Sequence, residues 1–279
     1  MKNAVLSTVL VLLSACILQA QSFQPQIIPL PENPEQTDFH FLKDELKDAQ
    51  VVLLGENSHF DGNVFEMKTK LVQMLVEEMG FTTIAFESGI YDVWLAQQKI
   101  RKGESVRESL ENALFPIWSK TKEFQSFIAF YEQHKNTVDL IGFDFQFSGR
   151  ENYTPLVQAL YDYATRIKGK IKLNPDDLAL LLESITSSGM FDEEDITYAQ
   201  FTSALAELQG KIKQQPESDE KGYWQQITKS LLELGKNAYS NQEIYSEFVV
   251  SASDNNRDKQ MADNVLAYLK ANPKAKVIC

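Results

Sequence analysis

Glu56, Glu87 and Asp144 each come directly after a short apolar run of β-prone residues. Each run is followed by a helical stretch, and this alternation is typical of a parallel sheet with crossover helices. In such sheets, ligands bind beyond the carboxyl ends of the strands. We therefore expect the three carboxylates to meet at one edge of the sheet, with His59 three residues after the first of them. A histidine among carboxylates is suited to acid–base catalysis.

His59 is predicted to lie in a loop just before a helix that begins near Gly62. The positive end of the helix dipole disfavours a charged imidazolium, so the ring could accept a proton. A carboxylate such as Glu56 or Glu87 could orient the ring and stabilise its charged form after the proton has arrived. The alternative is a purely local hydrogen bond of His59 within a capping loop.

Arg257 is the predicted partner of Glu87, because a carboxylate at the end of a buried strand needs one. The arginine lies at the N-terminal end of an apolar helical stripe. It could therefore pair with carboxylates or stabilise a developing oxyanion. An exposed arginine whose local partner is Asp254 or Asp258 fits the sequence equally well.

Asp144 and Trp118 are candidates for contact with a substrate. Asp144 could position the ring of His59, bind a substrate hydroxyl or cap the loop after its strand. Trp118 ends a compact apolar loop at residues 115–118, which is predicted to be core or the wall of a pocket. The same carboxylates with His59 could also hold a metal ion, although one histidine is few for zinc. The sequence has no Gly-x-Ser-x-Gly turn and no usable cysteine, so water activated by His59 is the simplest mechanism, and we predict neither metal nor cofactor.

The chain is acidic, with a formal net charge of -12. This charge argues against nucleic acid and against anionic membranes as partners. We therefore expect a small-molecule substrate. The sequence does not indicate an oligomeric state.

Residues 1–20 resemble an export signal, because a lysine precedes a short apolar run that ends in small residues. The run is too short and too weakly flanked for a stable membrane span, so we expect no integral span. Cleavage near Ala20 would give a periplasmic or secreted protein. The alternative is a lipoprotein in which Cys16 is acylated and anchors the chain. The only other cysteine is Cys279, so simple cleavage would leave no internal disulfide.

The fold class expected is α/β: a parallel-sheet core with crossover helices and an inserted all-helical cap. The cap is predicted because no strand signal appears between Tyr153 and about Gln242, and such caps often cover a site at the sheet edge. We expect the chain to be truncated, because a core strand that opens at its last residues needs partners along its length. The expected parts are a lead-in at 21–50, the first part of the core at 51–152 with strands near 51–54, 82–86 and 138–143, the cap at 153–242, and a return helix with the start of a further strand at 243–279.

The chain resembles the erythromycin esterase family in an ordered set of motifs that covers nearly all of it after the signal. In chain order, these motifs are L-G-E-N-S-H at 54–59, F-E-M-K at 65–68, E-M-G-F at 78–81, A-F-E-S at 85–88, F-P-I-W at 115–118, G-F-D-F-Q at 142–146, R-D at 257–258 and M-A-D-N at 261–264.

The resemblance implies an α/β core with added helices and a deep cleft. It implies that a histidine matching His59 activates water against a lactone, and that residues matching Glu56, Glu87 and Arg257 line the cleft. Phe60 stands where the family usually has glycine, so it is a candidate substrate contact that could alter access. Family members also continue into a segment with another histidine, beyond the strand that matches residues 277–279.

We therefore expect an esterase-like hydrolase that cleaves an ester or a lactone. A metal-dependent hydrolase that uses the same acidic edge of the sheet is one alternative. The other is a non-catalytic protein of the cell envelope that binds a small molecule.

Overall fold

The computed structural model describes residues 27–32, 34–56, 58, 59, 61–150, 153–167, 174–185, 192, 195–244 and 251–279. Its contacts divide the chain into Met1–Pro34 and Glu35–Cys279, and all the elements below belong to the second unit. The expected signal and Cys16 lie outside the described residues, so export stays a prediction. No helix in the described ranges combines the length and the apolar character needed to cross a membrane.

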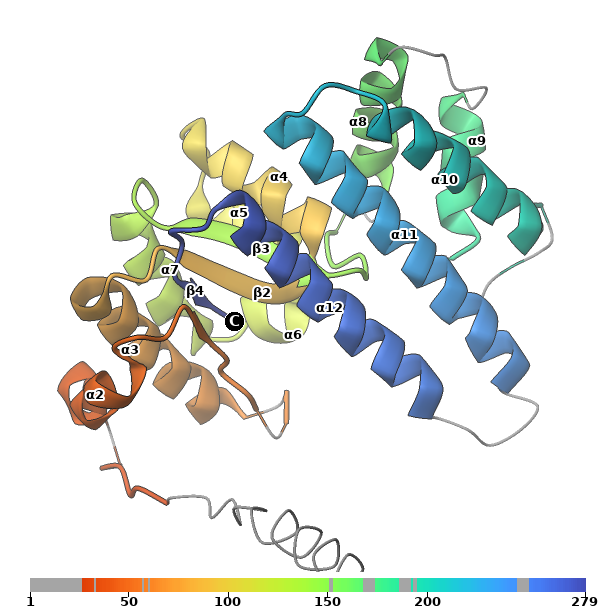
Figure 1. Ribbon diagram of the computed structural model, residues 1–279. Helices are drawn as coiled ribbons and strands as arrows, with labels where there is room; N and C mark the ends of the chain where they lie inside the picture. Colours follow the sequence, from red (N-terminus) through yellow and green to blue (C-terminus); the bar gives the residue numbers. More distant parts are fainter. Residues whose placement is uncertain are drawn as a thin grey trace, which may run out of the picture. The chain divides into compact units, whose positions relative to one another are not determined.

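A parallel sheet of four strands forms the centre of this unit (Figure 1). The strands pair in the order β1-β4-β2-β3, so the strand latest in the sequence lies between the first two. Their bounds are β1 (Val51–Val52), β2 (Thr83–Gly89), β3 (Asp139–Asp144) and β4 (Val277–Ile278). The predicted α/β class with a parallel sheet is confirmed. The predicted end of β2 at Phe86 was too early, because pairing resumes past an irregularity and joins Gly89 to Asp144.

Helices cover the sheet on both faces. On one face, Phe86 of β2 packs edge to face against Phe127 of α7, with the ring centroids 5.4 Å apart. On the other face, the Thr83 hydroxyl lies 2.9 Å from the Tyr268 hydroxyl of α12. The helices before β3 are η1 (Gln36–Leu42), α2 (Lys43–Leu46), α3 (Gly62–Met79), α4 (Ile90–Arg101), α5 (Val106–Ala113), α6 (Pro116–Ser119) and α7 (Phe124–His134).

The bounds of α3 follow from its sequence. The Asp61 side chain caps its start by accepting the N–H of Asn63 at 3.1 Å. Gly80 ends it in the left-handed conformation with φ of 70°, which glycine adopts without a steric penalty. The predicted start of a helix near Gly62 is therefore confirmed.

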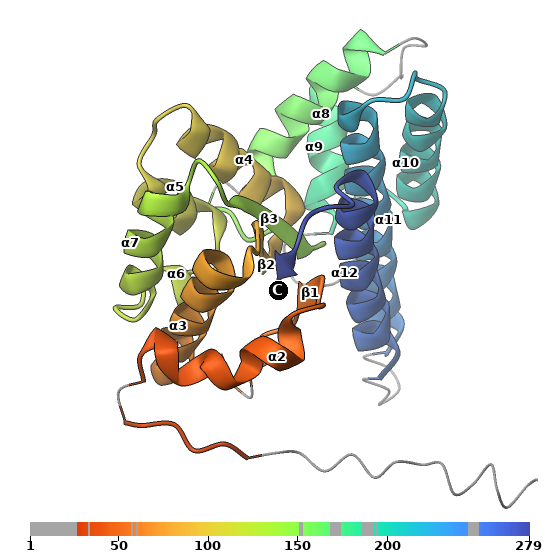
Figure 2. The same ribbon diagram turned by 60° about the vertical axis from the view of Figure 1, so that its left-hand side comes forward.

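A group of helices is inserted between β3 and β4, and no strand occurs there among the described residues. Figure 2 shows these helices packed together beside the sheet, with α11 and α12 side by side. Their core is built from buried residues such as Leu160, Phe201 and Trp224. The elements are α8 (Thr154–Arg166), α9 (Pro175–Glu183), α10 (Tyr198–Lys213), α11 (Asp219–Ile244) and α12 (Ser251–Ala271).

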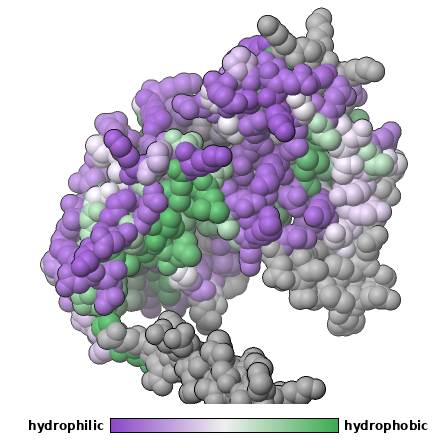
Figure 3. All heavy atoms as spheres, viewed as in Figure 1, coloured by the Kyte–Doolittle hydropathy of each residue, from purple (hydrophilic) through white to green (hydrophobic). Residues whose placement is uncertain are grey.

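One part of the sheet surface is apolar. Ala85 and Val277 are buried there under α12, with Phe143 and Cys279 packed against them. Figure 3 shows a hydrophobic surface over the region that holds β4. Leu53, which follows β1, is 75% exposed, so this apolar surface reaches solvent beside β1.

Gly235 in α11 should not tolerate a side chain. A Cβ atom there would overlap the ring of Phe201, which is fully buried. We expect Gly235→Ala to lower the free energy of unfolding by about 1–3 kcal/mol in urea denaturation, because overpacked cores are strained. Gly222→Ala, in the same helix but with no neighbour within 4 Å of its Cβ position, is the control. It should raise stability by up to about 1 kcal/mol through helix propensity, and equal effects of the two changes would contradict the packing.

Candidate active site

Glu56 and His59 lie together in the loop between β1 and α3. Strand pairing continues just beyond β1, because the Leu54 N–H donates to the Cys279 carbonyl at 2.6 Å. The chain then leaves the sheet, and the Nδ1 atom of His59 meets a carboxylate oxygen of Glu56. The Glu56 side chain is 12% exposed and that of His59 is 49% exposed. Glu56 thus holds the imidazole ring through Nδ1, and about half of the His59 side chain is open to solvent.

Lys68 of α3 holds the second oxygen of Glu56. Its Nζ atom lies 2.5 Å from Oε2, and its side chain is only 21% exposed. Burial is the largest single influence on Glu56 and opposes its ionisation, but the hydrogen bonds from Lys68 and His59 together outweigh it. The pKa of Glu56 therefore lies below its ordinary value, and the carboxylate is ionised at neutral pH.

Trp118 packs against the His59 ring. The two rings meet edge to face, with centroids 5.4 Å apart and planes at 77°. Trp118 is itself buried and rests on Phe65 and Phe115. Its indole N–H has no hydrogen-bond partner within the described residues. The tryptophan therefore limits the motion of the imidazole, and contact with a substrate stays a prediction.

Arg257 of α12 joins the ends of β2 and β3. Its Nη2 donates to Glu87 Oε1 at 2.7 Å and to Asp144 Oδ2 at 2.6 Å, and its Nε donates to Asp144 Oδ1 at 3.3 Å. The predicted pairing of Arg257 with Glu87 is thus present. Burial opposes the charge on Arg257, but hydrogen bonds and attraction from Asp144, then from Glu87, outweigh it and raise the arginine pKa above its ordinary value.

Asp144 is fully buried beneath this arginine. Both of its oxygens accept from Arg257, and Oδ1 also accepts the N–H of Gln146 at 3.2 Å. It therefore holds Arg257 in place and caps the loop after β3. A direct contact between Asp144 and a substrate stays a prediction.

Two clusters therefore lie at the carboxyl ends of the sheet: Glu56 with His59 and Lys68, and Arg257 with its two carboxylates. β4 lies between β1 and β2, so the strands that lead to Glu56 and to Glu87 are two strand spacings, or about 10 Å, apart. In the part of the chain that the structure describes, no hydrogen bond or ion pair joins them. A small substrate could contact both clusters at once. Phe60, the remaining predicted contact, lies outside the described residues.

Sequence reasoning missed Lys68 and the buried amides that fix α12. Lys68 interrupts the apolar stripe of α3, and a lysine on a buried helical face signals a carboxylate partner. Asn264 donates to the Phe143 carbonyl at 2.8 Å, while its side-chain oxygen accepts from Gln260 at 2.7 Å and from Ser230 at 3.1 Å. This network sets α12 against β3, and with it the position of Arg257.

The sequence left open a second interpretation, in which these carboxylates and His59 bind a metal ion. Among the described residues, no group of three histidine, cysteine, aspartate or glutamate side chains is arranged to hold an ion. The cations that face the carboxylates here are Lys68 and Arg257.

Fold and site together define an α/β protein with paired carboxylates, one histidine and one arginine at the carboxyl ends of a parallel sheet. A family model described as erythromycin esterase matches residues 76–279. The chain belongs to the erythromycin esterase family.

Individual relatives agree with this assignment. Erythromycin esterase type II of Escherichia coli is 26% identical over 262 residues, which cover 85% of this chain and 60% of that protein. The putative hydrolase YbfO of Bacillus subtilis (strain 168) is 30% identical over 119 residues, 41% of this chain and 26% of that protein. The fold is similar to that of a mutant erythromycin esterase, EreC, in its open conformation, with a TM-score of 0.68, 17% identity and coverage of 89% of this chain and 64% of that one. The chain thus spans about 60% of the length of its type II relative.

Glu56→Gln should test the charge of this cluster. Because the folded-state pKa of Glu56 is lowered, its ionisation stabilises the protein above the unfolded-state value of about 4.5. This stabilisation is lost as the pH falls through the folded-state pKa. We expect the variant to lose about 2 kcal/mol in urea unfolding at pH 7, and the difference from wild type to shrink below about pH 4.5.

Glu66→Gln is the matched control, because Glu66 is an exposed carboxylate on α3. It should change the free energy of unfolding by less than about 0.5 kcal/mol at either pH. A loss for Glu56→Gln that stays constant from pH 7 to pH 3 would contradict an ionised, paired Glu56.

Proposed function

We propose that this protein is a hydrolase that cleaves an ester or lactone bond in a small molecule, with His59 as the general base. The observation that carries the proposal is the hydrogen bond between Nδ1 of a half-exposed His59 and Glu56, whose side chain is 12% exposed. Because Nδ1 is directed at a carboxylate, its N–H is donated there and Nε2 remains to accept a proton. Membership of the erythromycin esterase family supports the same reaction class.

The proposed reaction begins with water next to His59. Nε2 removes a proton as the water oxygen attacks the carbonyl carbon, and the imidazolium that forms is stabilised by Glu56. The carbonyl oxygen becomes an oxyanion. The bond between the carbonyl carbon and the ester oxygen then breaks, and the leaving oxygen takes the proton from His59. The products are a carboxylic acid and an alcohol, which stay joined in one molecule if the substrate was a lactone.

Lys68 and Arg257 have separate roles in this proposal. Lys68 keeps Glu56 ionised, so the proton from water stays on the imidazole and is not passed to the carboxylate. Arg257 presents positive charge toward the oxyanion. Its Nη1 makes no hydrogen bond within the described residues, and its side chain is 28% exposed, so it could donate to a substrate oxygen.

The substrate is proposed as a class. Two relatives are named erythromycin esterases, so a macrolide lactone is the first compound to test, followed by simple aryl esters. We also propose that the protein is exported, on the strength of residues 1–20. Small-molecule binding without turnover would instead support the envelope binding protein considered from the sequence.

His59→Ala should abolish hydrolysis of any confirmed substrate. General-base catalysis contributes about 10²–10⁴ in rate, so kcat/KM should fall by at least about a hundredfold. His134→Ala is the control, because the His134 ring bonds to the Phe130 carbonyl at the end of α7 and lies outside the proposed mechanism. Turnover that survives in His59→Ala would sink the assignment of the base.

Hydrolysis should also survive removal of metal. We expect prolonged chelation to leave kcat/KM within about twofold of its starting value, because the proposed base is an imidazole paired with Glu56. Elemental analysis of the purified protein before and after chelation is the companion measurement. Stoichiometric zinc or manganese that leaves together with activity would replace this mechanism with the metal-dependent one.

A further inference from the structure

A buried hydrogen-bond network connects the ends of β2 and β3 just beyond Glu87 and Asp144. Its centre is Ser148, in the loop after β3, which is 7% exposed. The backbone N–H of Ser148 donates to Oδ2 of Asp92, in the first turn of α4, at 2.8 Å. The Ser148 hydroxyl oxygen accepts the N–H of Gly89, the last residue of β2, at 2.8 Å.

The same hydroxyl reaches a third element. It lies 2.6 Å from the carbonyl oxygen of Ala113, at the end of α5, and donates its hydrogen there. The N–H of Gly149 adds a second backbone hydrogen bond to Asp92. One carboxylate and one hydroxyl thus tie α4, α5, β2 and the loop after β3 together.

Glycines make room for this network. A Cβ atom on Gly149 would lie 2.5 Å from Oδ1 of Asp92. A Cβ atom on Gly89 would lie 2.7 Å from the Gln146 carbonyl, and one on Gly142 would lie 2.6 Å from the Ser88 carbonyl. Side chains do not approach other atoms so closely, so the backbones can meet here only because these residues are glycine.

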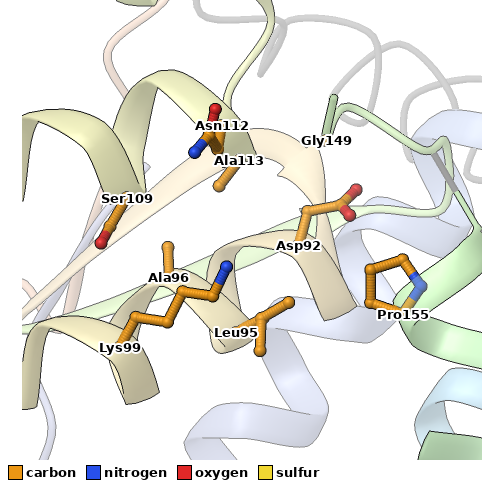
Figure 4. Close-up of a pocket in the computed structure, with 9 residues that line it drawn as sticks. All are labelled: Asp92, Leu95, Ala96, Lys99, Ser109, Asn112, Ala113, Gly149 and Pro155. Atoms are coloured by element: carbon orange, nitrogen blue, oxygen red, sulfur yellow. The ribbon is translucent and has the colours of Figure 1, made fainter. Parts of the chain in front are cut away.

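Two small cavities lie beside the network, so the packing around Asp92 is incomplete. A cavity of about 30 Å³ lies beside Asp92, between α4 and α5, and its lining includes the polar residues Lys99, Ser109 and Asn112 (Figure 4). A second cavity of about 20 Å³ touches Gly89, Asp92 and Asp144. Spaces of this size hold only a water or two. Hydrogen bonds to Asp92 and Ser148 therefore set the position of the loop together with Phe145 and Phe147, which pack in the core of the inserted helices.

The buried carboxyl group of Asp92 does not stabilise the folded state at neutral pH. Burial is the largest influence on it and raises its pKa to about 6, although hydrogen bonds from Ser148 and Gly149 partly oppose the rise. A carboxyl group whose pKa is raised by folding stabilises the folded state at low pH and loses that contribution as the pH rises through about 6. At neutral pH its charge therefore works against folding, which indicates a role in geometry.

We propose that Asp92 is a positioning residue for the cluster of Glu87, Asp144 and Arg257. Through Ser148 it fixes the two strand ends from which the carboxylates project, so that one guanidinium can bind both. Glu87 is two residues before Gly89, and Asp144 is four residues before Ser148. The catalytic consequence rests on the proposed function, but the effect on Arg257 does not.

The test follows the Nε–H signal of Arg257 by NMR in the full chain, assigned with Arg257→Lys. Asp92→Ala and Ser148→Ala each break the network, and Asp92→Asn keeps an oxygen that can accept the Ser148 N–H. Tyr131→Phe is the matched control. Tyr131 is also buried, and its hydroxyl lies 2.9 Å from the side-chain oxygen of Gln97 and 3.1 Å from the Val138 carbonyl, at the opposite end of β3.

We expect Asp92→Ala and Ser148→Ala to shift or broaden the Arg257 signal, Asp92→Asn to restore it, and Tyr131→Phe to leave it unchanged. With a confirmed substrate, kcat should fall about tenfold in Asp92→Ala while KM changes little, which is the size of a small displacement at the reacting groups. An Arg257 signal that is unchanged in both Asp92→Ala and Ser148→Ala, or equally changed in Tyr131→Phe, overturns the proposal. If Asp92→Ala does not fold, Ser148→Ala and Asp92→Asn decide. Absence of hydrolysis in the wild type would remove the proposed function, and the NMR result would still settle the role of Asp92.

Discussion

The ion pair between Arg257 and Asp144 is the constraint on which the rest of this structure depends. Asp144 is fully buried, and a buried carboxylate without a partner costs several kcal/mol. Helix α12 must therefore dock where its arginine can reach the ends of β2 and β3. The amides of Gln260 and Asn264 fix that docking by bonding to each other and to the Phe143 carbonyl. The guanidinium of Arg257 therefore determines how the inserted helices dock on the sheet and where the site forms.

Each cluster places a positively charged side chain beside carboxylates, with different chemical consequences. At Glu56, Lys68 occupies one oxygen and leaves the other to orient an imidazole that is open to solvent. At Asp144, the arginine occupies both oxygens and keeps part of its own surface exposed. The first arrangement suits proton transfer, and the second suits binding of a negative oxygen. The sheet holds these two functions apart by the width of β4.

The sequence predicts the parts of this site that depend on strand ends. Glu56, Glu87 and Asp144 follow apolar runs, and parallel pairing brings such positions to one edge of the sheet. The ion pair of Lys68 with Glu56 was not predicted, because helical periodicity gives the face on which a residue lies but not its partner across from that face.

Contacts that depend on the path of a loop could not be predicted in this way. Ser148 meets Asp92 only because the chain after β3 folds back over the start of α4. The position of β4 inside the sheet could not be predicted either, since a two-residue strand carries too little pattern to specify its neighbours.

The position of β4 also governs the order in which the sheet can assemble. Among the described strands, β1 pairs only with β4. The backbone of β1 therefore stays unpaired until residues 277–278 have been synthesised and have left the ribosome. Such high contact order slows folding and leaves an early strand open to aggregation during synthesis.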